Sequence, residues 1–243
     1  MANRPLIHST SGIELIRKIA ERGMVIFNTD QAKDLAPSVG ISKEYLRQAL
    51  HHLTKAGWII RLRKGLYSLS SSMPGIAPLH EFEIAMALLQ PAAISHWSAL
   101  NYHGLTEQTP RTVFILTPAR APNHAGKALR IHETIYQVIH TKSNRFFGIE
   151  AVWINESKVN ITDKERTLLD CLMAPQYCGG FFEVLHAFEK NSAKLDIQKI
   201  IEYVLKLDTS TIKRLGWILE HQGINHEILQ PLLAVPIKGY RAL

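Results

Sequence analysis

The sequence has little of what stabilises a secreted protein or anchors one in a membrane. Its 243 residues include two cysteines, Cys171 and Cys178, whose spacing fits neither a zinc ribbon nor a CxxC redox motif. No apolar run approaches the ~20 residues of a membrane span, and the first ten residues lack the apolar core of a secretory signal. We therefore expect two reduced thiols in a cytoplasmic protein.

Motifs of phosphate-handling and hydrolytic enzymes are also absent. The sequence contains no GxxxxGK[ST], GxGxxG, HExxH or GxSxG, and no Gly-Ser…Asp-x-Asp pattern of nucleotidyltransferases. The best candidate pair of carboxylates, Glu165 and Asp170, lies five positions apart, so the two side chains diverge around a helix. Arg166 and Asp170 have instead the spacing of a helical ion pair. We expect no catalytic site and no cofactor.

Histidines and aromatic residues gather in one segment, where they could suggest metal ligands. His96 and His103 are separated by seven positions, which is not a usual spacing for two ligands of one metal ion. We interpret these histidines and Trp97 as buried, hydrogen-bonded residues of a core helix, and we expect no metal site.

Positive charge, in contrast, is abundant and unevenly distributed. Residues 1–72 contain 11 Lys and Arg against 5 Asp and Glu, whereas residues 73–243 contain 17 against 16. Nearly all of the net charge of +7 therefore lies in the N-terminal part. A protein that binds phosphates must carry its cations where it contacts them, so this asymmetry predicts a nucleic-acid-binding first domain.

The order of elements in this first domain predicts a winged helix-turn-helix. Thr29 or Asp30 can cap a short helix over residues 31–36, which the Pro-Ser-Val-Gly turn at 37–40 follows. Ser42 then caps a helix that ends at Gly57 and has apolar residues at helical spacing. Two short β-rich runs, 58–62 and 66–69, flank a basic turn that contains glycine. In this architecture the second helix enters the major groove of DNA.

The candidate DNA-binding residues share two places, the polar face of the second helix and the tip of the hairpin. They are Lys43, Glu44, Arg47, Gln48, His51 and Lys55 on the helix, and Arg61, Arg63 and Lys64 on the hairpin. The alternative interpretation is an ordinary solvated helix face beside an ordinary charged hairpin.

The chain is predicted to hold a winged helix-turn-helix in residues 1–72, a linker in 73–78 and an α+β domain in 79–243. The first domain also includes a helix over 9–19 and a strand over 24–27 that pairs with the wing. In the second domain we expect helices at 80–89, 94–102, 162–173, 181–190, 196–205 and 209–222. Strands are expected at 112–116, 128–132, 134–140 and 147–154, and a capping box at Thr162 and Glu165.

Four segments are similar to those of AbiEi-type antitoxins, and they occur in the order found in that family. AISHWSALNYHGL (93–105) resembles the Ser-Ala-Leu…His-Gly-Leu segment, and ITDKERTLLDCL (161–172) resembles the Glu-Arg-Thr-Leu-Leu-Asp helix. KRLGWILE (213–220) is similar to the Arg-Leu-Gly-Tyr-Leu-Leu segment, and RKGLYSL (63–69) fits the wing of these proteins.

The resemblance implies an autorepressor that is the antitoxin of a bacterial type IV toxin–antitoxin system. Its partners would be operator DNA, bound by two protomers on inverted half-sites, and a nucleotidyltransferase-like toxin encoded beside it. Two alternatives stay open. One is a solitary, ligand-responsive regulator, and the other is a nuclease or nucleotide-processing enzyme that the winged helix directs to DNA.

Overall fold

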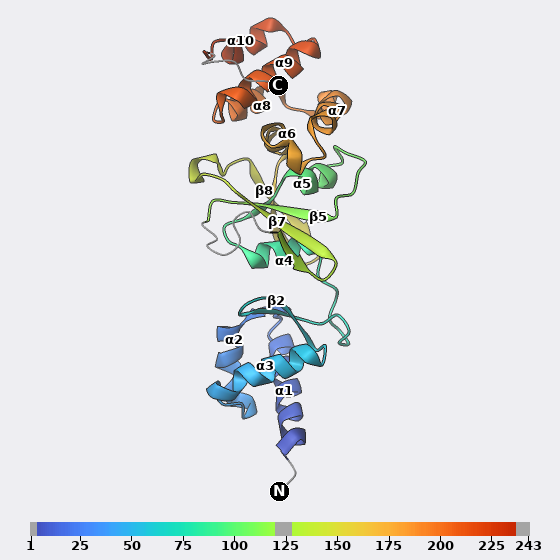
Figure 1. Ribbon diagram of the computed structural model, residues 1–243, viewed down its shortest axis with the longest axis vertical. Coiled ribbons are helices and arrows are strands. Elements are labelled where there is room, and N and C mark those ends of the chain that lie inside the picture. The colour runs from blue at the N-terminus through green and yellow to red at the C-terminus, as the bar shows by residue number, and fades with distance from the viewer. Residues whose placement is uncertain (1–3, 120–127, 237–243) are drawn as a thin grey trace. The chain divides into compact units, whose positions relative to one another are not determined.

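The computed structural model describes residues 4–119 and 128–236, which fold into two compact units, Met1–His80 and Glu81–Leu243 (Figure 1). Each unit has its own hydrophobic core. Within the described ranges, no helix combines the length and the apolar character needed to cross a membrane.

The first unit contains helices around a small sheet. Its elements are α1 (Arg4–Glu21), β1 (Ile26–Asn28), α2 (Thr29–Leu35), a 3-10 turn (Ala36–Val39), α3 (Lys43–Lys55), β2 (Ile59–Arg63) and β3 (Leu66–Leu69). The strands are antiparallel in the order β1-β3-β2, so the predicted pairing of the first strand with the wing is confirmed. Helix, turn, helix and hairpin follow one another as expected.

The apolar residues of α3 explain where this helix lies. Leu46, Ala49, Leu50 and Leu53 are buried in a core that α1 also supplies. The Oγ atom of Ser42 accepts a hydrogen bond from the backbone of Tyr45, which confirms the predicted N-cap.

The start of α2 differs from the prediction. Its N-cap is Asn28, not Thr29 or Asp30: the Asn28 side chain accepts from the Gln31 backbone at 2.8 Å, and the Gln31 side chain accepts from the Asn28 backbone at 2.7 Å. Asn28 is the last residue of β1 and is extended, so its side chain can fold over the first turn of the helix.

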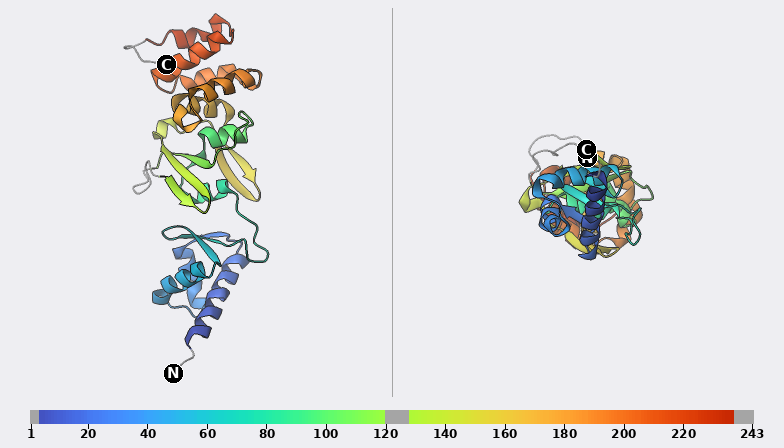
Figure 2. Two further views of the ribbon diagram at one scale, coloured as in Figure 1. Left: turned by 45° about the vertical axis from the view of Figure 1, so that its right-hand side comes forward. Right: turned by 90° about the horizontal axis from the view of Figure 1, so that it is seen from below.

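The second unit is built on a mixed sheet of six strands in the order β6-β7-β5-β4-β9-β8. The strands are β4 (Ala93–Ile94), β5 (Thr112–Thr117), β6 (Ala128–Ile131), β7 (Thr134–His140), β8 (Ile149–Ile154) and β9 (Ser157–Thr162). Helix α4 (Glu81–Leu88) lies on one face of this sheet and α5 (His96–Tyr102) on the other (Figures 1 and 2). This α+β arrangement is the predicted fold class.

Five further helices complete the second unit, which confirms that the last third is mostly helical. They are α6 (Lys164–Met173), α7 (Phe181–Asn191), α8 (Ile197–Val204), α9 (Thr209–His221) and α10 (His226–Leu233). Strand β9 and helix α10 were not predicted. Both nevertheless have a periodic pattern that could have indicated them. Val159 and Ile161 alternate with polar residues in β9, and α10 has apolar residues at helical spacing around Pro231, at Ile228, Leu229, Leu232 and Leu233.

Two predictions in this unit are wrong at element boundaries. Residues 94–102 are not one helix, because Ile94 pairs with β5 on one side and β9 on the other, so α5 begins only at His96. Thr162 is the last residue of β9 and does not cap α6. Asp163 is the cap, and the Glu165 side chain accepts from the Asp196 backbone at 3.1 Å.

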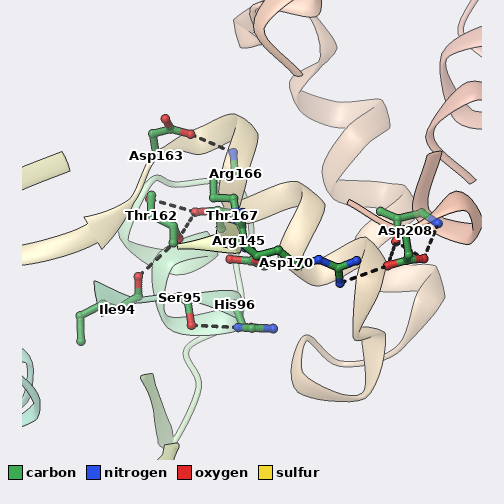
Figure 3. Close-up of polar contacts among 11 residues, drawn as sticks. Ile94, Ser95, His96, Arg145, Thr162, Asp163, Arg166, Thr167, Asp170 and Asp208 are labelled. Atoms are coloured by element: carbon green, nitrogen blue, oxygen red, sulfur yellow. Dashed lines mark hydrogen bonds and ion pairs between the residues drawn. The ribbon is translucent and has the colours of Figure 1, made fainter. Parts of the chain in front are cut away.

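A buried polar network joins the sheet to the helices (Figure 3). Arg166 is fully buried; its Nε donates to Asp170 Oδ1 at 2.9 Å, which confirms the predicted ion pair. The guanidinium carbon lies 4.4 Å from the centre of the Phe147 ring. The hydroxyl groups of Thr162 and Thr167 are 2.7 Å apart. The buried Arg166 charge is thus paired with Asp170, although Arg166 Nη1 and Asp170 Oδ2 have no hydrogen-bond partner among the described residues.

His96 lies beside this ion pair and is buried, as predicted. Its Nδ1 is 2.8 Å from the Ser95 hydroxyl oxygen, and its ring meets the Tyr177 ring edge-on. Burial lowers the pKa of His96 to about 4; the nearby Asp170 carboxylate raises the pKa and Arg166 lowers it, both by less. His96 is therefore neutral in the folded protein near pH 7.

The contact between Gly148 and α6 yields a first prediction. Gly148 has a φ of +65°, and a β-carbon there would lie 2.8 Å from Arg166 Cβ and 2.9 Å from a Tyr203 ring carbon. We expect Gly148→Ala to lower the free energy of unfolding by about 2–4 kcal/mol, the sum of backbone strain and steric overlap.

Gly104→Ala is the matched control for urea unfolding. Gly104 has a φ of +64°, but a β-carbon there would meet nothing within 4 Å. Strain alone should cost about 1 kcal/mol. Equal losses in both variants would contradict the close packing at Gly148.

The burial of His96 yields a second prediction, on the pH dependence of stability. Below its ordinary pKa of 6.5, His96 takes up a proton in the unfolded chain but not in the folded protein until the pH nears 4. The contribution of neutral His96 to the free energy of unfolding is therefore fully present above pH 6.5. It decreases as the pH falls toward 4, by about 3 kcal/mol in total.

Urea unfolding of the wild type and of His96→Gln from pH 7.5 to pH 4 measures this contribution. The variant should lose less stability over this range, whatever its stability at pH 7. His132→Gln is the control, because His132 is exposed and has a similar φ of +52°. The assignment is wrong if the wild type and His96→Gln lose stability in parallel.

Candidate nucleic-acid interface

A hollow of about 990 Å³ lies on the first unit between α3, the wing and the start of α2. Its lining residues are Thr29, Asp30, Lys33, Lys43, Leu46, Arg47, Gln48, Leu50, His51, Thr54, Arg61, Lys64, Gly65 and Tyr67. They include five cationic side chains and one carboxylate.

Helix α3 presents one line of polar residues to this hollow. Lys43, Arg47, His51 and Thr54 follow one another at spacings of four, four and three, which places them along one side of a helix. Leu46 and Leu50 lie at the edge of this line and form the apolar floor of the hollow, where α3 meets the core. The line of polar side chains is therefore fixed in direction by the buried face of the same helix.

The wing is held against the start of α2. The backbone N–H of Thr29 donates to the Gly65 carbonyl oxygen at 3.0 Å, and the Thr29 hydroxyl donates to the same oxygen at 3.4 Å. Gly65 has a φ of +77°, a conformation that suits the two-residue turn of this hairpin. Because of this connection, α2, α3 and the wing surround one hollow of fixed shape.

Six of the nine predicted DNA-binding residues line the hollow: Lys43, Arg47, Gln48, His51, Arg61 and Lys64. The other three lie elsewhere on the same elements. Lys55 is exposed in the last turn of α3, where a cation favours the helix dipole. Arg63 donates to the Lys64 carbonyl oxygen at 3.5 Å, which turns its guanidinium back to the wing.

Glu44 lies in the first turn of α3, where its carboxylate is close to the N-terminus of the helix. Hydrogen bonds from its own backbone N–H and from the Ser42 hydroxyl hold the pKa of Glu44 below its usual range. A carboxylate at this position interacts favourably with the helix N-terminus. This local role accounts for Glu44 without any contact to DNA.

The structure adds lining residues that the sequence did not indicate: Thr29, Asp30, Lys33, Thr54 and Tyr67. Three of them belong to α2, the first helix of the helix-turn-helix. The sequence feature that could have indicated the α2 residues is the helix-turn-helix motif itself, because its first helix lies beside the second and approaches the DNA backbone. Which of its residues face the hollow depends on how α2 packs, which its seven residues are too few to show as a pattern.

The cations of the hollow are free to bind phosphate. No described residue forms an ion pair with Lys33, Lys43, Arg47, Arg61 or Lys64. Elsewhere on this unit, Arg17 of α1 is paired with Glu14 and Glu21. Unpaired cations around a concave surface attract a polyanion and release its counterions when it binds.

Two carboxylates of the second unit, Asp163 and Glu165, meet at the Lys199 ammonium, which Asp163 Oδ2 contacts at 3.1 Å. Both also have structural partners, because Asp163 caps α6 and Glu165 accepts from the Asp196 backbone. Glu165 contacts the Lys199 ammonium at 2.9 Å, whereas Asp170 contacts Arg166 inside the core. A cleft of about 210 Å³ contains Glu183, but this carboxylate accepts hydrogen bonds from Thr106 and Gln108. Among the residues that the structure describes, no three His, Cys, Asp or Glu side chains form a group able to hold a metal ion.

Comparisons with known proteins agree with this geometry. The fold is similar to the crystal structure of the RV2827C protein from Mycobacterium tuberculosis, with a TM-score of 0.67 and 16% identity, over 93% of this chain and 81% of that chain. At this identity the similarity establishes a shared fold. No curated protein matches the sequence significantly.

Residues 14–70 match a family model described as transcriptional regulator, AbiEi antitoxin. These residues run from α1 to the end of the wing and include every residue that lines the hollow. The part of the chain that folds as a winged helix-turn-helix thus matches the AbiEi antitoxin family of transcriptional regulators, which confirms the resemblance predicted from the sequence.

Proposed function

We propose that the protein is a transcriptional repressor that binds its own operator through the hollow of the first unit. The hollow itself carries this proposal, because it joins unpaired cations on α3, α2 and the wing around one concave surface. α3 enters the major groove, which is about 12 Å wide and admits a helix. Repression follows because the bound protein occludes the promoter.

The lining residues divide into two roles. Arg47 and Gln48 lie in the middle of α3 and read base edges, since Arg pairs with guanine and Gln with adenine in the major groove. Arg61 and Lys64 of the wing contact phosphates, together with Lys43 at the start of α3. Two protomers bind inverted half-sites, as is usual for helix-turn-helix proteins.

We further propose that the second unit is an antitoxin domain that acts against a nucleotidyltransferase-like toxin encoded beside the gene, and that it has no enzymatic activity. The family match lies in the first unit, residues 14–70, and its description names an antitoxin; in the second unit, the support is the resemblance of residues 93–105, 161–172 and 213–220 to antitoxin segments. Asp163 and Glu165 meet at Lys199, but the first caps α6 and the second accepts from the Asp196 backbone, so we assign them a structural role and not a catalytic one.

A third prediction distinguishes residues that contact bases from residues that contact phosphates. Arg47→Ala should reduce the preference for the operator over a random duplex, because a base contact is worth about 1–3 kcal/mol. Lys64→Ala should weaken binding to both duplexes about equally and lower the salt slope by about one. Titrations at several salt concentrations measure both effects.

Arg17→Ala is the control, because Arg17 is paired on α1 and does not line the hollow. Its affinities should match those of the wild type. Unchanged binding of both duplexes by Arg47→Ala would contradict the placement of α3 in the major groove.

A fourth prediction separates repression from antitoxin action. Co-expression with the neighbouring toxin gene should permit growth with the full chain and with residues 81–243, but not with residues 1–80. The full chain with Arg47→Ala and Lys64→Ala should also protect, since its second unit is unchanged. Protection by residues 1–80 alone would show that repression is the protective act and would overturn the antitoxin role of the second unit.

A further inference from the structure

Asp30 is the single carboxylate among the lining residues of the hollow. It lies in the first turn of α2, two residues after the N-cap Asn28, and it is exposed. No described residue forms an ion pair with it. DNA that enters the hollow therefore meets one negative charge among five positive ones.

A carboxylate at a DNA interface is costly unless it finds a donor. Against phosphate it is repulsive, and this repulsion acts on every duplex regardless of sequence. In the major groove, however, cytosine N4 and adenine N6 carry amino groups that a carboxylate can accept from. The cost is then recovered only on a duplex that places such a base opposite Asp30. A group that penalises wrong partners in this way produces specificity.

We infer that Asp30 is a specificity-determining residue, which accepts a hydrogen bond from the exocyclic amino group of one base in the operator. This inference rests on the proposed DNA-binding function of the hollow. Asp30 lines the same hollow as Arg47 and Gln48, so a duplex that enters the hollow passes close to all three residues. The proposed role of Asp30 adds a base contact from α2, the first helix of the motif, to those made by α3.

A local structural role is the competing explanation. A carboxylate in the first turn of a helix stabilises the helix dipole, and Asp30 occupies such a position in α2. That role would affect the stability of α2 but not the choice between DNA sequences. The test must therefore compare affinities for two duplexes and not only the loss of binding.

The experiment uses the full chain and a duplex that the wild type selects from a random pool, compared with a random duplex of equal length. Asp30→Ala should bind the random duplex about threefold more tightly, since it removes one repulsive charge together with the acceptor oxygens. Its preference for the selected duplex should fall about tenfold, the value of one base contact. A second selection with this variant should lose the requirement for cytosine or adenine at one position.

Asp34→Ala is the matched control, because it removes the same charge from an exposed position of the same helix, outside the lining of the hollow. It should keep the wild-type preference. Equal preference and the same selected sequence for the wild type and Asp30→Ala would overturn the inference and leave the helix-dipole role. A wild type that binds no duplex would instead overturn the proposed function itself.

Discussion

The buried face of α3 is the constraint on which the candidate interface depends. Leu46, Leu50 and Leu53 are each at most 6% exposed, and burial of an aliphatic side chain of this size contributes about 1.5–3 kcal/mol. One residue of rotation turns a helix by about 100°, which would bring a charged side chain into the core. The core therefore sets the direction of Arg47 and its neighbours, although none of the polar residues contributes to that packing.

The wing depends on the same core through a different connection. β3 is the central strand of the small sheet and pairs with β1, and the Tyr67 ring stacks on the buried Phe27 ring. The bond from Thr29 to the Gly65 carbonyl then fixes the hairpin tip to α2. The backbone segments that carry the cations of the wing and of α3 are thus positioned by the core of the first unit before DNA binds, which reduces the entropy lost on binding.

The second unit has a different organisation, in which the segments that resemble the antitoxin family lie in the core. α5, α6 and α9 come from these segments, and they pack through buried residues such as Leu100, Leu169 and Leu215. The Arg166–Asp170 pair belongs to the same region. The family model matches residues 14–70 and does not reach these segments, so their resemblance stays a prediction, and the similarity to the RV2827C protein shows a shared fold. Residues of the second unit that contact a partner protein need not belong to these buried segments.

The sequence alone determined those features that follow from local periodicity and from charge. The apolar spacing of α3, the glycine turn of the wing and the spacing of Arg166 and Asp170 each involve neighbouring residues, and the structure has them as predicted. The concentration of cations in the first 72 residues is a property of composition and needs no coordinates.

Only the tertiary structure decided which distant residues meet. Ile94 became a strand residue because β5 and β9 offer it hydrogen-bonding partners, which outweighs its helical pattern. Asp30 and Lys33 came to line the hollow because α2 packs beside α3, and the pKa of His96 fell because its segment is buried next to an ion pair. Each outcome depends on contacts between segments far apart in the chain, and local sequence patterns carry no information about such contacts.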